Sequence, residues 1–117
     1  MILDPNIRLE AVLAGAVSTD QPEYHVDYRN YNQQGQVTRP AVNRGELNSA
    51  TDVTLLAAPY QSFITEIFGL QILNKDTANV VLTLKTTDGS TDRFILTQTL
   101  AANESLIYTI TEGFTII

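Results

Sequence analysis

Apolar and polar residues alternate with a period of two along most of this chain, which is typical of half-buried β-strands. The clearest alternation lies between Val80 and Tyr108, where Val80, Leu82 and Leu84 fall on one face and the residues between them fall on the other. The Asp88-Gly89 pair that follows is a strong hairpin signal, and a second alternating run comes after it. This half of the chain therefore predicts antiparallel β-structure.

The same pattern recurs at intervals along the rest of the chain. We expect strands over residues 8–17, 24–29, 51–57, 63–73, 80–86, 91–100, 104–110 and 114–117. Residues 8–17 also match helical spacing, and the strand is favoured because Gly15 weakens a helix and the surrounding segments are all β. Gly69, in the middle of a long apolar run, predicts a bulge or bend.

Regular strand and turn signals with no convincing helix predict an all-β fold, an antiparallel β-sandwich or jelly-roll of seven to eight strands. We expect residues 8–117 to form a single domain preceded by an extended N-terminal arm, residues 1–7. Residues 32–48, which are polar and contain Gly35, Pro40 and Gly45, are expected to form a long loop. The predicted core comprises Val26, Leu55, Ile67, Leu82, Leu84, Phe94, Leu96, Leu106 and Tyr108.

Composition excludes several classes of function. With 117 residues the chain can bury about two-thirds of its unfolded surface, so a hydrophobic core can be stable without disulfide or metal cross-links. It has no cysteine, which rules out disulfides and thiolate metal sites, and its net charge of −6 disfavours sequence-independent binding of nucleic acid. The sequence shows no signal-peptide pattern and no apolar run that could span a membrane, so we expect a soluble protein.

The residue types that carry catalysis are scarce. His25 is the only histidine, which removes most catalytic triads and multi-histidine metal sites, and it is expected to face solvent on its strand. Asp and Glu residues fall mostly at turn positions, where they have local hydrogen-bonding roles. We therefore expect no enzymatic activity, no cofactor and no metal site, although a calcium ion between loops stays an open alternative.

Aromatic and arginine side chains are enriched at protein interfaces, so they define the candidate interaction residues. Tyr31 lies among Asn and Gln residues in a polar stretch, whereas Tyr24 and Tyr28 alternate with polar residues and are expected to pack in the core. The predicted interface residues are Ile2 and Leu3 of the arm, together with Tyr31, Gln33, Arg39 and Arg44. Tyr31 with its neighbouring amides is also compatible with carbohydrate binding.

Several stretches of strand and turn sequence are similar to known proteins. They are Leu13 to Thr19, Gln21 to Tyr24, Val53 to Pro59, Ile72 to Ala78 and Leu100 to Tyr108, with a closing Gly113-Phe114. The most specific pieces are N-x-D-T-A before the hairpin and L-x-x-x-E-S-L after it. Over most of its length the chain resembles small β-sandwich virion structural proteins of tailed bacteriophages, of the capsid decoration or cement type.

The resemblance implies a non-enzymatic role on the capsid exterior, after assembly in the host cytoplasm. The partner would be the major capsid protein or another virion protein, and a homo-oligomer is expected, with a trimer favoured. Two alternatives stay open: a tail, neck or baseplate component with the same fold, and a carbohydrate-binding module that uses the Tyr31 region as its platform.

Overall fold

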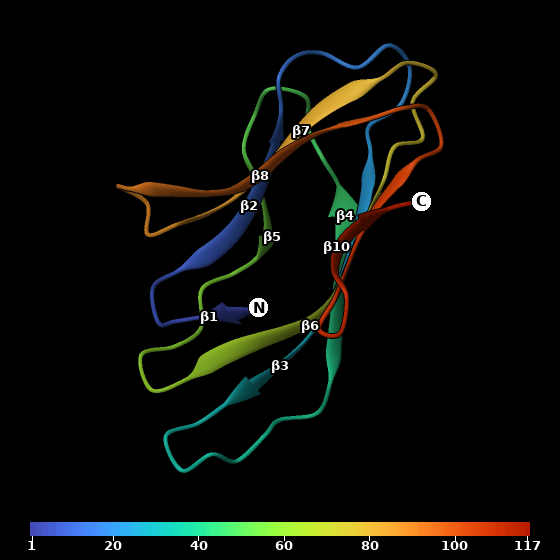
Figure 1. The fold of residues 1–117 in the computed structure, drawn as a ribbon. Coiled ribbons are helices and arrows are strands. Elements are labelled where there is room, and N and C mark those ends of the chain that lie inside the picture. Colours follow the sequence, from blue (N-terminus) through green and yellow to red (C-terminus); the bar gives the residue numbers. More distant parts are fainter.

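The computed structural model describes residues 1–117 and confirms the all-β prediction, with two antiparallel sheets packed face to face (Figure 1). The strands are β1 (Ile2–Leu3), β2 (Arg8–Leu13), β3 (Glu23–Tyr31), β4 (Ala41–Glu46), β5 (Val53–Leu56), β6 (Ile64–Leu73), β7 (Val80–Thr87), β8 (Asp92–Leu100), β9 (Ser105–Thr109) and β10 (Gly113–Ile116). The chain is therefore a β-sandwich.

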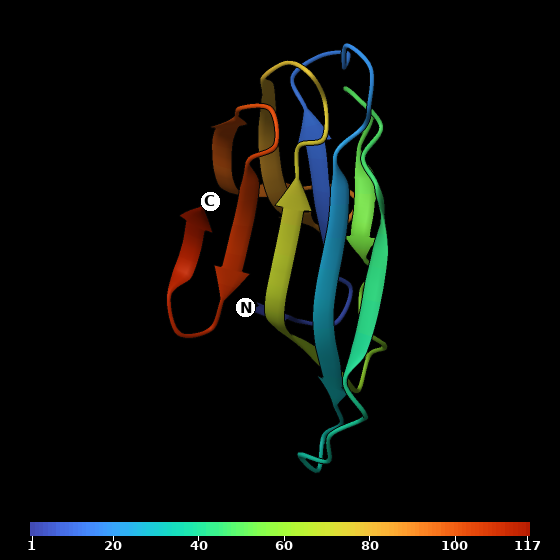
Figure 2. The ribbon, with the colours of Figure 1, turned by 90° about the vertical axis from the view of Figure 1, so that its right-hand side faces the viewer.

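The larger sheet has the strand order β10-β9-β6-β3-β4, and β1 pairs with the first part of β6 (Figure 2). The smaller sheet has the order β5-β2-β7-β8. The expected irregularity at Gly69 is present: the register shifts between Asp27 and Tyr28, so that Phe68 is an extra residue beside Gly69 on β6. A Cβ at Gly69 would lie 2.9 Å from Asp27 Oδ2, so glycine lets the two strands approach there.

The core lies between the sheets and is built from alternate residues of each strand. Leu82 and Leu84 of β7, like Val26 and Ile72 of the larger sheet, are completely buried. The fully or nearly fully buried apolar residues are Leu3, Leu9, Ala11, Leu13, Tyr24, Val26, Leu47, Leu55, Leu56, Ile67, Leu70, Ile72, Val80, Leu82, Leu84, Leu100 and Leu106. Leu96 and Tyr108 are partly buried and pack against this cluster, as expected from the sequence.

The N-x-D-T-A stretch forms a buried polar corner at one end of the sandwich. The side-chain amide of Asn74 donates to the carbonyl oxygens of Ala78, Leu100 and Ala101 at 2.9 to 3.1 Å, and its Oδ1 accepts from the Asp76 amide. Asn74 is completely buried. It therefore ties the β6–β7 turn to the β8–β9 turn by satisfying carbonyl groups that no strand pairs.

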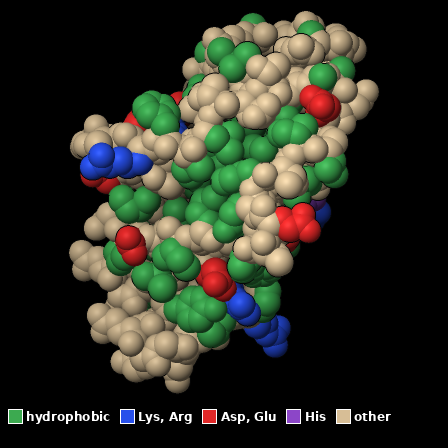
Figure 3. Space-filling view, viewed as in Figure 1, with side chains coloured by type: hydrophobic (Ala, Val, Ile, Leu, Met, Phe, Trp, Pro, Cys, Tyr) green, Lys and Arg blue, Asp and Glu red, His purple; other side chains and the backbone are tan.

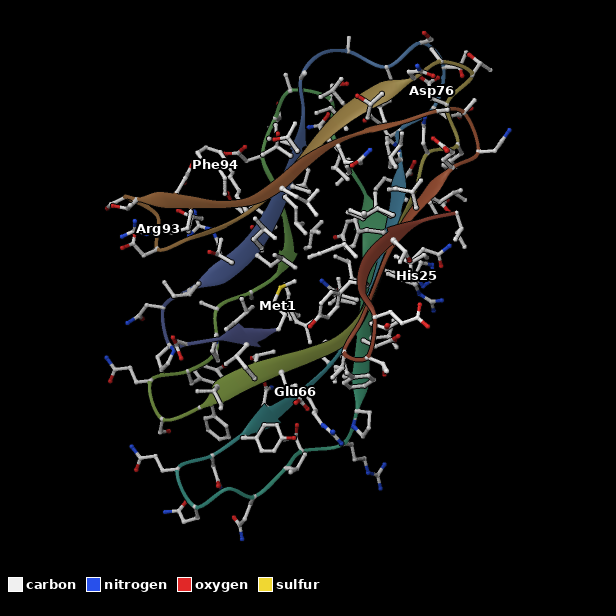
Figure 4. The ribbon with its side chains drawn as sticks, viewed as in Figure 1. Met1, His25, Glu66, Asp76, Arg93 and Phe94 are labelled. Carbon is white, nitrogen blue, oxygen red and sulfur yellow. The ribbon has the colours of Figure 1, made fainter.

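Asp76 fastens a third connection to the same corner (Figure 4). Its carboxylate accepts the backbone amides of Ser18, Thr19 and Asp20 from the β2–β3 loop at 2.8 to 3.2 Å, and the Thr19 hydroxyl at 2.9 Å. These hydrogen bonds, that of the Ser18 amide foremost, hold the pKa of Asp76 well below its ordinary value. The β2–β3, β6–β7 and β8–β9 connections are thus held together by hydrogen bonds to the side chains of Asn74 and Asp76.

The expected N-terminal arm is not confirmed, because the first residues belong to the larger sheet. Ile2 and Leu3 pair with Glu66 and Thr65, and the Met1 amino group donates to the Ile67 carbonyl at 3.1 Å and to the Tyr108 hydroxyl at 2.6 Å. The Leu3 side chain is fully buried in the core. Hydrophobic burial therefore places this segment inside the domain.

The expected loop over residues 32–48 is only partly a loop, because strand β4 occupies Ala41–Glu46. As an edge strand, β4 pairs antiparallel with β3 alone, and its half-buried face carries only Ala41, Asn43 and Gly45, so the large apolar residues that mark a strand are missing from the sequence. β1 and β4 account for the difference between the eight expected strand segments and the ten observed.

Phe94 was predicted to lie in the core, and that prediction is wrong. The register of β7 and β8 shifts between Leu84 and Lys85, so Leu96 pairs with Leu84 whereas Phe94 pairs with Lys85. The extra residue between them turns Phe94 to the outer face of the smaller sheet, where it is 70% exposed. A single bulge thus reverses the orientation of the first part of the strand.

The burial of β1 generates a testable prediction. Leu3→Ala should lower the free energy of unfolding by about 2–5 kcal/mol, because it removes a fully buried side chain from the core. Ile2→Ala is the matched control, since Ile2 is 51% exposed on the same strand and should change stability far less. Urea unfolding measures both changes. Equal, small effects would show that β1 is not part of the folded core.

The hydrogen bonds to the Asp76 carboxylate predict that the free energy of unfolding depends on pH. Because its pKa is lowered on folding, Asp76 stabilises the protein above about pH 4 and loses this contribution as the pH falls through its folded-state pKa. Asp76→Asn should be less stable at pH 7 and should lose less stability between pH 4 and pH 2. Urea unfolding over this pH range tests it, with Asp4→Asn as the control at an exposed position. Parallel pH profiles for wild type and Asp76→Asn would contradict the assignment.

Candidate binding surface at the hairpin end

The end of the sandwich opposite the Asn74 corner carries two loops that project side by side, and we call it the hairpin end (Figure 1). It comprises the β3–β4 loop, residues 32–40, and the β5–β6 loop, residues 57–63. The β3–β4 loop is ordered by Asn32, whose Oδ1 accepts the amides of Gln34 and Gln36 and whose Nδ2 donates to Gln36 Oε1. An isolated bridge between Tyr31 and Val37 narrows its base.

Between the two loops lies an open cleft of about 400 Å³. Its apolar lining consists of Tyr28, Leu56, Ala57, Ala58, Pro59, Tyr60 and Phe63, and its polar lining consists of Asn30, Thr38 and Thr65. Tyr60 is 84% exposed at the rim, and no hydrogen bond is formed by its hydroxyl. An exposed aromatic ring beside a cleft with amide and hydroxyl groups suits recognition of another molecule.

On the outer face of the larger sheet, opposite the face that lines the cleft, Arg29 and Tyr31 form a connected cluster with Glu66, whose position Figure 4 shows. Arg29 Nε and the Tyr31 hydroxyl both donate to Glu66 Oε1, each at 3.0 Å. The Arg29 guanidinium lies 5.4 Å from the Phe68 ring centroid and 5.9 Å from that of Tyr31. The hydrogen bonds from Arg29 and Tyr31 lower the pKa of Glu66, so this carboxylate is ionised and holds both side chains in place.

The hairpin end differs in charge from the rest of the chain. Its two loops, residues 32–40 and 57–63, contain one charged residue, Arg39, and no acidic residue, while Arg29 at their base is paired with Glu66. In a chain of net charge −6 this makes the hairpin end the favoured side for an acidic partner surface.

The structure gathers part of the predicted interface set at this end. Tyr31, Gln33 and Arg39 lie in or beside the β3–β4 loop, with Gln33 and Arg39 exposed, and Ile2 is exposed on β1 opposite Glu66. Arg44 is exposed but lies further along β4, beside His25. Leu3 was a wrong choice for an interface, because its side chain is fully buried.

Sequence reasoning did not identify the residues that form the cleft, above all Tyr60 and Phe63. The available signal was the Pro59-Tyr60 pair within a segment that ends a strand, since an aromatic residue in a turn has no strand face on which to be buried. Asn30 and Thr38 could not be paired from sequence alone. They meet because strands β3 and β4 fold back on each other, so that the backbone N–H of Asn30 donates to the Thr38 hydroxyl at 3.0 Å.

The remaining charged clusters are internally paired. Lys85 Nζ lies 2.9 Å from Asp92 and 3.0 Å from Asp52, while Arg8 Nε lies 2.7 Å from Glu10 on the same face of the smaller sheet. The hydrogen bonds to Asp92 and Asp52 raise the pKa of Lys85. His25 is exposed on the outer face of the larger sheet. No three His, Cys, Asp or Glu side chains are grouped so that they could hold a metal ion.

The fold defines this chain as a two-sheet, all-β sandwich protein with an aromatic cleft at one end. Comparison with known proteins found no matching family model, no matching curated protein and no matching solved structure. The structure has no helix that is long and apolar enough to cross a membrane.

The cluster at Glu66 yields a prediction about Tyr31. Tyr31→Phe should lower the free energy of unfolding by about 1 kcal/mol, because it removes the hydroxyl that donates to Glu66. Tyr60→Phe is the matched control and should leave stability unchanged, since the Tyr60 hydroxyl has no partner and the side chain is 84% exposed. Urea unfolding compares the two. If the two variants were equally stable, the Tyr31 hydroxyl would have no role in ordering the hairpin end.

Proposed function

We propose that this chain is a non-enzymatic structural protein of a tailed-bacteriophage virion, which decorates the capsid exterior and binds neighbouring major capsid subunits through its hairpin end. The observation that carries the proposal is the exposed aromatic cleft at Tyr60, flanked by loops whose single charged residue is Arg39, on a chain of net charge −6. Aromatic and arginine side chains together are the residues that contribute most to protein interfaces.

The rest of the molecule is consistent with such a role. The paired carboxylates at Lys85 and the single exposed histidine offer no arrangement of nucleophile, base and oxyanion donor. The Asn74 corner and the two packed sheets hold the opposite end rigid, so that the loops at the hairpin end are presented on a fixed support. A small rigid domain with a projecting contact surface suits a protein that clamps its neighbours.

Two alternatives use the same surface. A tail, neck or baseplate component would bind a different virion subunit through the hairpin end. A carbohydrate-binding module would stack a sugar ring on an exposed aromatic residue and bind its hydroxyls through amides. In this structure the residue placed for stacking is Tyr60, beside Asn30 and Thr38, because the Tyr31 hydroxyl is engaged by Glu66.

The test uses particles of the virus that encodes this chain. Wild-type protein should bind to purified capsids that have been stripped of it. Tyr60→Ala and Arg39→Ala should each weaken that binding at least tenfold, because both are exposed at the hairpin end. Asn79→Ala, exposed at the opposite end, is the control and should bind like wild type. Co-sedimentation with capsids, repeated at increasing salt, measures the affinity and its electrostatic part.

The outcomes separate the alternatives. Immunogold labelling of tails instead of heads would overturn the capsid location in favour of the tail component. Binding to a glycan array that is lost in Tyr60→Ala, without binding to any virion part, would support the carbohydrate-binding module and overturn the virion proposal.

A further inference from the structure

The two long sides of the sandwich differ in whether the edge strands of the two sheets are joined to each other. On one side the edge strands β4 and β5 are joined across the sheets, because Asn43 Nδ2 donates to the Leu55 carbonyl at 2.6 Å and Leu47 fills the space beside them. On the other side the edges are β8 of the smaller sheet and β10 of the larger one, and these strands diverge without a hydrogen bond between them (Figure 1). The sandwich is therefore closed on one side and open on the other.

The open side exposes apolar side chains that belong to the interior. Leu96, Tyr108, Phe114 and Ile116 all point between the sheets, but each is only partly buried. Figure 3, which looks onto this side, shows hydrophobic side chains running across its middle, and Figure 4 shows Met1 lying between the two sheets there. Such a continuous apolar surface is uncommon on a protein that acts as a monomer.

Over most of its length, strand β8, which borders this opening, lacks the charged residues and prolines that usually prevent an edge strand from pairing with another chain. From Phe94 to Leu100 strand β8 contains no charged residue, no proline and no glycine, and most of its side chains are exposed. Edge strands that stay unpaired usually carry charges or proline, because their free N–H and C=O groups otherwise pair with another strand. Of the two edge strands on the closed side, β4 has this protection, with Arg44 and Glu46 exposed along it.

We infer that a second copy of this chain pairs antiparallel with β8, through the β8 strand of each copy, around a two-fold axis. Such pairing satisfies the free backbone groups of both strands with one symmetric contact. The added strand also extends the smaller sheet over the opening, so that Leu96 and its neighbours are covered by their counterparts in the partner.

Strand β8 can pair with a second copy despite the net charge of −6, because residues 94–100 carry no charge and pairing along them brings no like charges together. Antiparallel pairing places the Asp92-Arg93 end of one strand beside the uncharged end of the other. Strand β8 has nine residues and is about 30 Å long. Together with the apolar opening, pairing along this length can approach the roughly 800 Å² per partner of a stable complex.

This inference does not depend on the proposed function, because β8 and the hairpin end are separate surfaces. It replaces the trimer expected from the sequence resemblance with a two-fold pair. It also leaves both hairpin ends accessible to a partner.

Light-scattering mass across a concentration series tests the inference. Wild type should approach twice the 12.9 kDa of the chain as concentration rises. Gln98→Lys, which places a charge on the inward face of β8 at the opening, should raise the dimer dissociation constant at least tenfold. Thr97→Lys, on the exposed face of the same strand, is a second variant that should weaken pairing. Gln71→Lys makes the same substitution at an exposed position of the central strand β6 and should dimerise like wild type.

Circular dichroism and urea unfolding confirm that each variant is folded before its mass is interpreted. A wild type that stays monomeric at all concentrations, or that forms a trimer, would overturn the inference. So would a dimer that neither β8 variant weakens. Growth without a limit would instead indicate head-to-tail contacts between β8 and another edge, and would also refute the two-fold pair.

Discussion

The hydrogen bonds of Asn74 and Asp76 are the constraint on which the arrangement of the two sheets depends. A sandwich needs its connections to cross from one sheet to the other, and every crossing leaves backbone groups without a strand partner. Here two buried side chains satisfy those groups for three connections at once. The Asp76 carboxylate accepts backbone amides and the Asn74 amide donates to backbone carbonyls, so neither residue can be exchanged for an apolar one without leaving these groups unpaired.

The rigid corner explains why functional features gather elsewhere. Loops at the fixed end are engaged in internal hydrogen bonds, whereas the loops at the hairpin end have side chains such as Tyr60 that are mostly exposed to solvent. The Arg29, Tyr31 and Glu66 cluster orders the base of the hairpin without filling the cleft. The molecule thus separates the residues that maintain its shape from those free to contact a partner.

Much of the fold was predictable because period-two alternation and turn residues act locally. The eight strands inferred from sequence are present, and the buried leucines of β7 are where the alternation puts them. Non-local effects were not predictable. Phe94 faces outward because of a bulge opposite Lys85, β1 is a strand because β6 lies beside it, and β4 pairs on one side only. For the site, residue type indicated Tyr31, Gln33 and Arg39, but only the folded loops reveal that Tyr60 and Asn30 share a cleft.

The pairing of β1 with β6 also bears on how the molecule folds. Met1 and Leu3 contact residues more than sixty positions away, and the Met1 amino group reaches Tyr108 near the other end of the chain. These contacts close very large loops, which costs more conformational entropy than closing the β7–β8 hairpin. During folding, residues 1–3 therefore reach their native positions only after β6, and for the Met1 amino group also Tyr108, has been brought to them. Until then Leu3 is exposed, and the newly made domain has an incomplete core.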